Sequence, residues 1–165
     1  MIAAAAVAPA TPAVAAHPAG PSSSQIHTAI SSAQHSKLLW ATVNICNTKQ
    51  HPDTIGIRAQ MPSLPFAASL SVQVQVDYWS TAANRFLPDP GVSRSVPLGE
   101  MANRITQGGA NFRFQPPVVL SGTVTFEWKL AGKTIGRATR LTGHGYRGVQ
   151  AGDPTGYSTA TCRIS

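Results

Sequence analysis

The clearest indication of the fold is the stretch at residues 70–78, which is Leu70-Ser71-Val72-Gln73-Val74-Gln75-Val76-Asp77-Tyr78. Every second residue is apolar, and the residues between them are polar. Because successive side chains of a strand point to opposite faces of its sheet, this alternation predicts an antiparallel strand with one buried and one exposed face. The stretch therefore favours an all-β protein whose core lies against one face of a sheet.

The same pattern recurs at residues 123–130, where Val124, Phe126, Trp128 and Leu130 form the apolar phase. An Ala-Gly pair follows, which predicts a hairpin in which residues 133–141 return beside this strand. Glu127 and Lys129 fall on the outer phase. Further strands are predicted at residues 39–45, 54–59, 111–115 and 158–164.

Glycine and proline separate these strands. The chain has 14 glycines and 13 prolines, and this turn-rich content argues against a helical bundle. Turns or loops are predicted at Pro62-Ser63-Leu64-Pro65, Pro88-Asp89-Pro90-Gly91, Gly108-Gly109, Pro116-Pro117 and Gly152-Asp153-Pro154. Residues 102–107 are the one place after residue 37 where a single helical turn is expected. About seven short strands joined by such turns predict an antiparallel β-sandwich.

The N-terminal part differs from this body. Residues 1–16 are small, apolar and uncharged, with Ala13-Val14-Ala15 as a cleavage pattern, and this predicts a signal-peptide-like leader. A low-complexity Ala/Pro leader is the alternative, and no membrane span is expected because the apolar run is short and contains prolines. Residues 17–37 are predicted to be a flexible polar spacer, with a short amphipathic helix over residues 26–33 as the alternative. Residues 38–165 form the predicted β-sandwich domain.

The chain contains two cysteines, Cys46 and Cys162. In a cytosolic protein they would be two unrelated thiols, whereas an even count in an exported chain favours one disulfide. The bond would join the first and last predicted strands of the domain. In the chain-entropy model, closing such a loop contributes on the order of 4–5 kcal/mol of stability.

Three stretches carry a resemblance to a known family: residues 40–46, 51–59 and 153–162, which contain both cysteines. They resemble small exported proteins of unassigned function from high-GC Gram-positive bacteria, of the actinobacterial type. The similarity spans roughly residues 38–164 of this chain. It implies an immunoglobulin-like fold, a secreted compartment and paired cysteines, and it implies no activity.

The sequence offers little material for catalysis, because it contains only 6 carboxylate side chains and no G-x-S-x-G or P-loop motif. His51-Pro52-Asp53 is interpreted as a loop rather than as a general base or metal corner. A metal-dependent hydrolase is the less favoured alternative, and it would require His51, His144 and Asp153 to meet. We therefore expect no enzyme, no catalytic residue, no cofactor and no metal.

The charge balance is basic, with 13 Lys and Arg against 6 Asp and Glu, a formal charge of +7 and a pI near 10.1. The cations are spread rather than clustered, so no nucleic-acid binding is expected. Arg113, Lys129 and Arg137 are expected to share an outer face that Glu127 interrupts. These features predict a monomeric, non-catalytic binding or structural domain, secreted or at the cell surface, that associates with anionic cell-wall polymers or a surface glycan.

A carbohydrate-binding module is the main alternative. It would use exposed aromatic side chains, and it requires Trp79, Tyr146 and Tyr157 to lie coplanar on one face. The candidate binding residues are Trp79, His144, Tyr146, Arg147 and Tyr157. Tyr78, Phe126 and Trp128 are predicted to be core residues, and Trp40 lies on the polar phase of its strand.

Overall fold

The alternating stretch at residues 70–78 lies within strand β3 (Ala68–Ser80) and is buried on the expected face. Leu70, Val72, Val74 and Val76 are each at most 2% exposed. Residues 20–165 are described by this computed structural model, and they form helix α1 (Ser23–Gln34) and eight strands. The other strands are β1 (Trp40–Cys46), β2 (Thr54–Pro62), β4 (Arg85–Met101), β5 (Ile105–Arg113), β6 (Val118–Leu130), β7 (Lys133–Gly143) and β8 (Cys162–Ile164).

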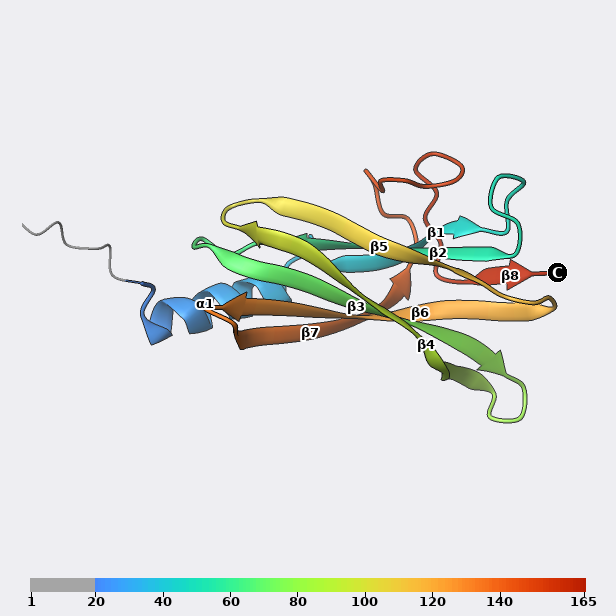
Figure 1. The fold of residues 1–165 in the computed structure, drawn as a ribbon, viewed down its shortest axis with the longest axis horizontal. Coiled ribbons are helices and arrows are strands. Elements are labelled where there is room, and N and C mark those ends of the chain that lie inside the picture. Colours follow the sequence, from blue (N-terminus) through green and yellow to red (C-terminus); the bar gives the residue numbers. More distant parts are fainter. Residues whose placement is uncertain (1–19) are drawn as a thin grey trace, which may run out of the picture.

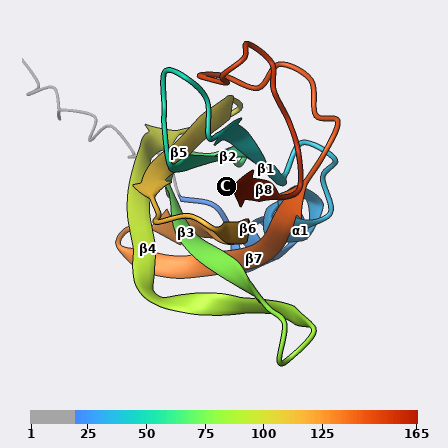
Figure 2. The same cartoon turned by 90° about the vertical axis from the view of Figure 1, so that its right-hand side faces the viewer.

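The strands are hydrogen-bonded in the order β4-β3-β6-β7-β1-β2-β5, and β8 pairs with the beginning of β6. All neighbours are antiparallel except β1 and β7. The sheet curls on itself, so that β4, β3, β6 and β7 form one layer and β1, β2 and β5 form the other (Figures 1 and 2). The predicted immunoglobulin-like antiparallel β-sandwich is confirmed, although its two layers join along β1 and β7.

The core lies between these layers. Phe126 and Trp128 are fully buried, as the alternation of their strand predicts, and the Trp128 indole N–H donates a hydrogen bond to the Pro62 carbonyl at 3.0 Å. Ile55 and Ile57 of β2 pack against them from the opposite layer as part of the same cluster. The apolar phase of β6 is therefore confirmed.

A disulfide joins Cys46, at the end of β1, to Cys162, at the start of β8, with the two Cα atoms 5.3 Å apart. The predicted pairing is confirmed. Disulfides persist in oxidising environments, so the bond is compatible with an extracellular protein. Within residues 20–165, no helix is both long and apolar enough to cross a bilayer.

The prediction of a flexible spacer over residues 17–37 is wrong for its described part, where α1 forms. Ser22 caps the helix in a capping box with Gln25, and this supplies partners for the first free N–H groups. Ile30 and Ala33 are buried, and Ile30 lies against Gly136 of β7; this packing offsets the weak apolar content of the segment. The helical alternative over residues 26–33 lies inside α1. The predicted leader at residues 1–16 lies outside the described residues.

Two predicted turns are also wrong, because they lie inside strands. Residues 88–91 belong to β4, where the ladder to β3 is irregular and the strand has no second neighbour that would need the proline N–H groups. Gly108 and Gly109 belong to β5, where a Cβ on Gly109 would lie 2.0 Å from the Ile57 carbonyl oxygen. Glycine there permits close contact with β2. The single helical turn expected at residues 102–107 does not form, since β5 begins at Ile105.

The strand predicted at residues 158–164 is reduced to β8, and the residues before it belong to a long loop. The predicted loops at residues 62–65, 116–117 and 152–154 are confirmed in outline, since each joins strands or lies in that long loop. The long loop runs from β7 to β8 over residues 144–161 and is called the covering loop below.

Candidate functional site

The covering loop lies against the outward face of β1, on the upper side of the molecule in Figures 1 and 2. It receives polar contacts from β1: Thr42 Oγ1 lies 2.8 Å from Ser158 Oγ and 3.1 Å from the Thr159 carbonyl oxygen. Asn44 Nδ2 donates to the Ala151 carbonyl oxygen at 2.6 Å. The polar phase of β1 is buried beneath the loop, which supplies hydrogen-bond partners for Thr42 Oγ1 and Asn44 Nδ2.

Between the covering loop and strand β2 lies a pocket of about 510 Å³. Its walls come from the end of β1, the β1–β2 loop, the outward faces of β2 and β5, and the covering loop. The lining residues are Ile45, Gln50, His51, Arg58, Asn111, Ala151, Gly152, Asp153, Pro154 and Thr155. Most of them carry hydrogen-bonding side chains, so the chemistry of the pocket suits a polar ligand better than an apolar one.

Arg58 is the cation of this pocket. Its side chain is half-buried on the outward face of β2, and within residues 20–165 it makes no ion pair and no side-chain hydrogen bond. Its Nε is buried without a partner. Burial lowers the pKa of the Arg58 guanidinium, but an arginine side chain remains charged in proteins. The pocket thus contains a positive charge with unused donors.

Two asparagines lie beside Arg58 on the same outward face. A Cβ on Gly56 would lie 2.8 Å from Asn44 Oδ1 and 2.8 Å from Asn111 Oδ1, so both amides converge above this glycine. Asn44 Oδ1 is buried without a hydrogen-bond partner in the described residues. Gly56 therefore provides the space in which the two amides approach β2.

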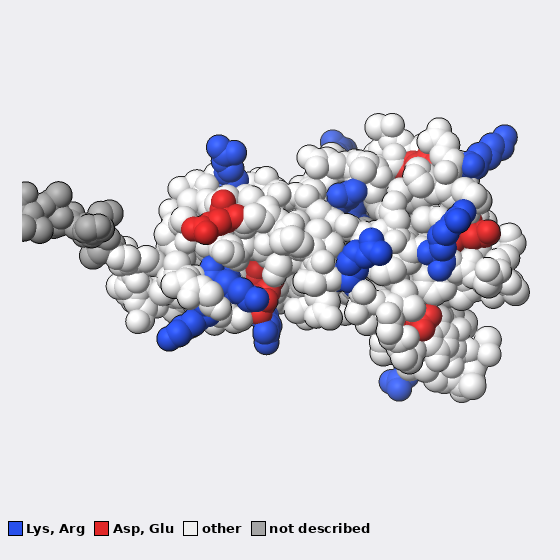
Figure 3. All heavy atoms as spheres, in the orientation of Figure 1, with Lys and Arg blue, Asp and Glu red and all other residues white. Residues whose placement is uncertain are grey.

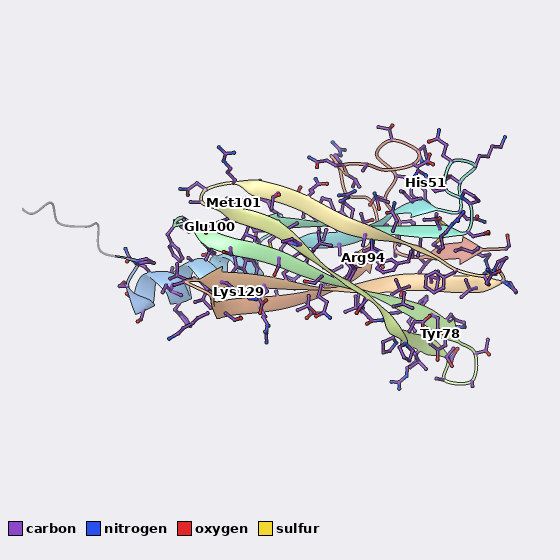
Figure 4. The ribbon with its side chains drawn as sticks, viewed as in Figure 1. His51, Tyr78, Arg94, Glu100, Met101 and Lys129 are labelled. Carbon is purple, nitrogen blue, oxygen red and sulfur yellow. A yellow bond between two sulfur atoms is a disulfide. The ribbon has the colours of Figure 1, made fainter. Side chains whose placement is uncertain are left out.

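His51 and Asp153 form the other wall. His51 Nδ1 lies 3.1 Å from Asp153 Oδ2, and Thr48 Oγ1 donates a hydrogen bond to the same oxygen. The Thr48 and His51 hydrogen bonds together lower the pKa of the Asp153 carboxyl. Figure 4 shows His51 on the β1–β2 loop, beside the covering loop. Because its Nδ1 is engaged by Asp153, only the Nε2 atom of His51 is left for other contacts.

The metal-dependent hydrolase alternative required His144 to join this pair. His51 and Asp153 do meet, but His144 lies exposed in the covering loop and is absent from the pocket wall. Within residues 20–165, no three His, Cys, Asp or Glu side chains are placed to hold a metal ion. Residues 51–53 lie in the loop between β1 and β2, as predicted.

The structure does not bring the predicted aromatic residues together. Tyr146 stacks on Trp40 with ring centroids 4.9 Å apart, and Tyr157 packs against the core cluster. Trp79, 39% exposed, lies at the end of β3 and meets Phe86 edge-on. The β3–β4 hairpin and the covering loop lie on opposite sides of the molecule (Figure 2). The coplanar platform needed by the carbohydrate-binding alternative is therefore not formed.

Arg147, the remaining candidate from the sequence, is exposed in the covering loop. Its part in binding, like that of Trp79 and His144, stays a prediction.

The prediction that Arg113, Lys129 and Arg137 share one basic face is also wrong. Glu127 Oε2 lies 3.0 Å from Lys129 Nζ, and Glu127 Oε1 lies 2.6 Å from Arg137 Nη2, so both cations are paired. Hydrogen bonds from Thr134 and Lys129 are the main causes that lower the pKa of Glu127 to about 2. Arg113 lies on β5 in the other layer. Figure 3 shows lysines and arginines scattered over the visible face rather than gathered in one patch.

The alternation does not single out Arg58, Asn44 or Asn111 as site residues. The sequence does show that these residues point away from the core. Asn44 and Arg58 lie on the polar phases of the strands predicted at residues 39–45 and 54–59, and Asn111 is the first residue of the strand predicted at residues 111–115. What the pattern lacks is the order of the strands and the presence of the covering loop above them.

Comparisons with known proteins show only distant likeness. No protein-family model matches the chain, and no curated protein matches it significantly. A glycosyl hydrolase family 2 member from Bacteroides cellulosilyticus DSM 14838 is similar over 66% of this chain and 15% of its own, with 10% identity and a TM-score of 0.38. A putative beta-galactosidase from Bacteroides fragilis is similar over 68% of this chain and 17% of its own, with 10% identity and a TM-score of 0.35. The chain thus spans less than a fifth of either structure.

Proposed function

We propose that this chain is a non-catalytic binding domain that works outside the cell and associates with anionic cell-wall polymers. One observation carries the proposal. Of the 13 Lys and Arg side chains, all of which lie within the described residues, only Lys129 and Arg137 are within ion-pair distance of a carboxylate. The other cations have no such protein partner in residues 20–165, so they can attract an anionic ligand.

The cations are spread over the face shown in Figure 3 rather than gathered in one patch, and this favours an extended ligand over a compact one. Their potentials add over about one Debye length, near 8 Å at physiological salt. A repeating polyanion can contact several of them in turn without needing a shaped groove. Such binding is weak, tolerates variation in the ligand and falls as salt concentration rises. The disulfide and the signal-peptide-like leader support an extracellular location for this role.

The test is retention of the purified full chain on isolated cell-wall polymer and on polyglutamate at low and high ionic strength. We expect retention at low salt and elution as salt rises. A triple variant Arg104→Gln, Arg113→Gln, Arg147→Gln, which changes three exposed cations, should elute at lower salt. The matched variant with Lys at the same positions keeps the charge and should elute like the wild type.

The outcome that contradicts the proposal is absence of retention at low salt, or equal elution of the Gln and Lys variants. Retention that persists unchanged at high salt would instead favour the carbohydrate-binding alternative. That alternative has one observation in its favour: Trp79 borders a cavity of about 440 Å³ together with Pro117, Val118 and Arg163. A Trp79→Ala variant would then be the one to lose retention.

A further inference from the structure

We infer that the Arg58 pocket is a binding site for one singly charged oxyanion, a carboxylate or a phosphodiester. The inference rests on the proposed function, because it names the group of the polymer that would enter this pocket. It depends on three features of the pocket. The arginine has no partner, the residues beside it on the neighbouring strands offer no carboxylate, and a carboxylate in the pocket wall limits the charge of the ligand.

The arginine is the source of affinity. A charge that is partly removed from water is unfavourable unless a counter-charge or acceptors replace the lost hydration. Arg58 forms no ion pair and no side-chain hydrogen bond among the described residues, and its buried Nε lacks any acceptor. An anion entering the pocket would supply both the charge and the acceptor oxygens. The planar guanidinium can donate two parallel hydrogen bonds to two oxygens of one group.

The strand register explains why no side chain from the neighbouring strands pairs with Arg58. Arg58 is paired in the ladder with Thr42 of β1 on one side and with Gly109 of β5 on the other. The Thr42 hydroxyl is engaged by the Gly143 carbonyl oxygen at the end of β7 and by Ser158 of the covering loop, and Gly109 has no side chain. Neither flank can therefore offer a carboxylate to Arg58. Asn111, two residues from Gly109 on β5 and opposite Gly56, adds an amide to the pocket wall.

The covering loop keeps the pocket open. Asn44 Nδ2 donates to the carbonyl oxygens of Gln150 and Ala151 at 3.3 and 2.6 Å, at the start of the lining residues 151–155. The Asp153 backbone N–H donates to the Asn44 carbonyl oxygen at 2.9 Å. These bonds attach the loop to β1 on one side of the pocket, and Arg58 lies on the other side.

The charge of the walls selects the ligand. Asp153 lines the pocket as a carboxylate, and the hydrogen bonds from Thr48 and His51 keep it ionised. A dianion beside Asp153 would meet repulsion from a fixed negative charge, whereas a monoanion gains from Arg58 with less repulsion. Carboxylates and phosphodiesters both present two oxygens that share a single negative charge. Both can therefore accept the two parallel hydrogen bonds that a guanidinium donates.

The experiment is a titration of the full chain with small probes, followed by NMR of the arginine Nε–H groups. Acetate and dimethyl phosphate represent the two sources of the oxyanion, and acetamide is the uncharged control. We expect a saturable shift of the Arg58 signal with at least one of the two anions and none with acetamide. Saturation by acetate alone would assign a carboxylate polymer, and saturation by dimethyl phosphate alone would assign a phosphodiester polymer.

Arg58→Gln should raise the dissociation constant of the binding probe by roughly tenfold or more, because charge-assisted hydrogen bonds are lost. Lys129→Gln, which removes one positive charge from a side chain already paired with Glu127, should leave it unchanged. No saturable Arg58 shift with either anion overturns the inference, and this readout needs only the wild-type chain, so a folding defect of the variant cannot mask it. Equal binding by Arg58→Gln, with its fold verified by its amide spectrum, also overturns it.

The two proposals fail separately. Salt-sensitive polymer retention without any Arg58 shift would leave the proposed function standing and refute the pocket. An Arg58 shift with a small anion, in a chain that no polymer column retains, would support the pocket and refute the polymer as its ligand.

Discussion

The contact between α1 and β7 leads to a prediction that can be worked out in detail, because it depends on one glycine. A Cβ on Gly136 of β7 would lie 2.6 Å from Ile30 Cδ1 and 2.7 Å from Ile30 Cγ2, closer than van der Waals contact allows. Ile30, only 7% exposed, occupies the space that a side chain at residue 136 would need. The perturbations are Ile30→Ala, Gly136→Ala and the double variant.

Ile30→Ala removes three buried carbons, and at about 0.8 kcal/mol each this amounts to roughly 2.4 kcal/mol. The residual cavity adds to this, within the range of about 2–5 kcal/mol for such changes. Gly136→Ala introduces a clash of about 1–3 kcal/mol, partly offset by about 0.5–1 kcal/mol because alanine suits a strand better than glycine. In the double variant the new methyl group enters the vacated space. Its destabilisation should therefore be at least about 1 kcal/mol smaller than the sum of the single effects.

The assay is urea unfolding of the four proteins with the disulfide intact, analysed as a double-mutant cycle. Hydrogen exchange of the α1 amides should report the same order, since local opening of the helix is governed by this contact. Ser31→Ala is the matched control: Ser31 is the next residue, it is exposed, and its change should stay within about 0.5 kcal/mol.

Additive single effects, within about 0.5 kcal/mol, would refute the packing argument. An Ile30→Ala variant as stable as Ser31→Ala would mean that α1 does not dock on β7, and that the spacer expected from the sequence is the better description of residues 20–37.

Three other predictions concern the core, the disulfide and the outer face of β6. Cys162→Ser should lower the unfolding free energy by about 2–5 kcal/mol, and alkylation of the native wild type should find no free thiol. Trp128→Ala should cost about 3–5 kcal/mol in chemical unfolding and Glu127→Ala about 1 kcal/mol or less; the reverse order would contradict the strand phase. Because the pKa of Glu127 falls from 4.5 to about 2 on folding, its stabilisation is present above pH 4.5 and lost as pH drops to 2. Glu127→Gln should reduce this acid sensitivity, and an unchanged pH profile of unfolding would contradict the assignment.

The sequence is sufficient to predict strands whose two faces meet different surroundings. In β3 and β6, one face meets the core and the other meets water, so residues alternate and the buried set can be identified by counting. The disulfide is predictable for a similar reason, because two cysteines allow only one intramolecular pairing. Both features depend on information that lies within one strand or in the count of one residue type.

The sequence is insufficient where burial depends on a distant segment. Strand β1 is buried on both faces, since the covering loop, about a hundred residues further along the chain, lies on its polar phase. Helix α1 has few large apolar residues, and its stability depends on the space that Gly136 leaves on β7. The stretch at residues 88–91 has the composition of a turn, yet the edge position of β4 allows prolines within a strand.

The Arg58 pocket shows this division most clearly. That Arg58 lies on the polar phase of a strand is evident from the apolar residues Ile57 and Ala59 on either side of it. That it is half-buried and unpaired depends on the order of β1, β2 and β5, on Gly109 opposite it, and on the loop that holds Asp153 nearby. Local alternation determines which way a side chain points, because the strand geometry is local. What that side chain meets is decided only in the tertiary structure, because burial and pairing depend on segments that the chain brings together by folding.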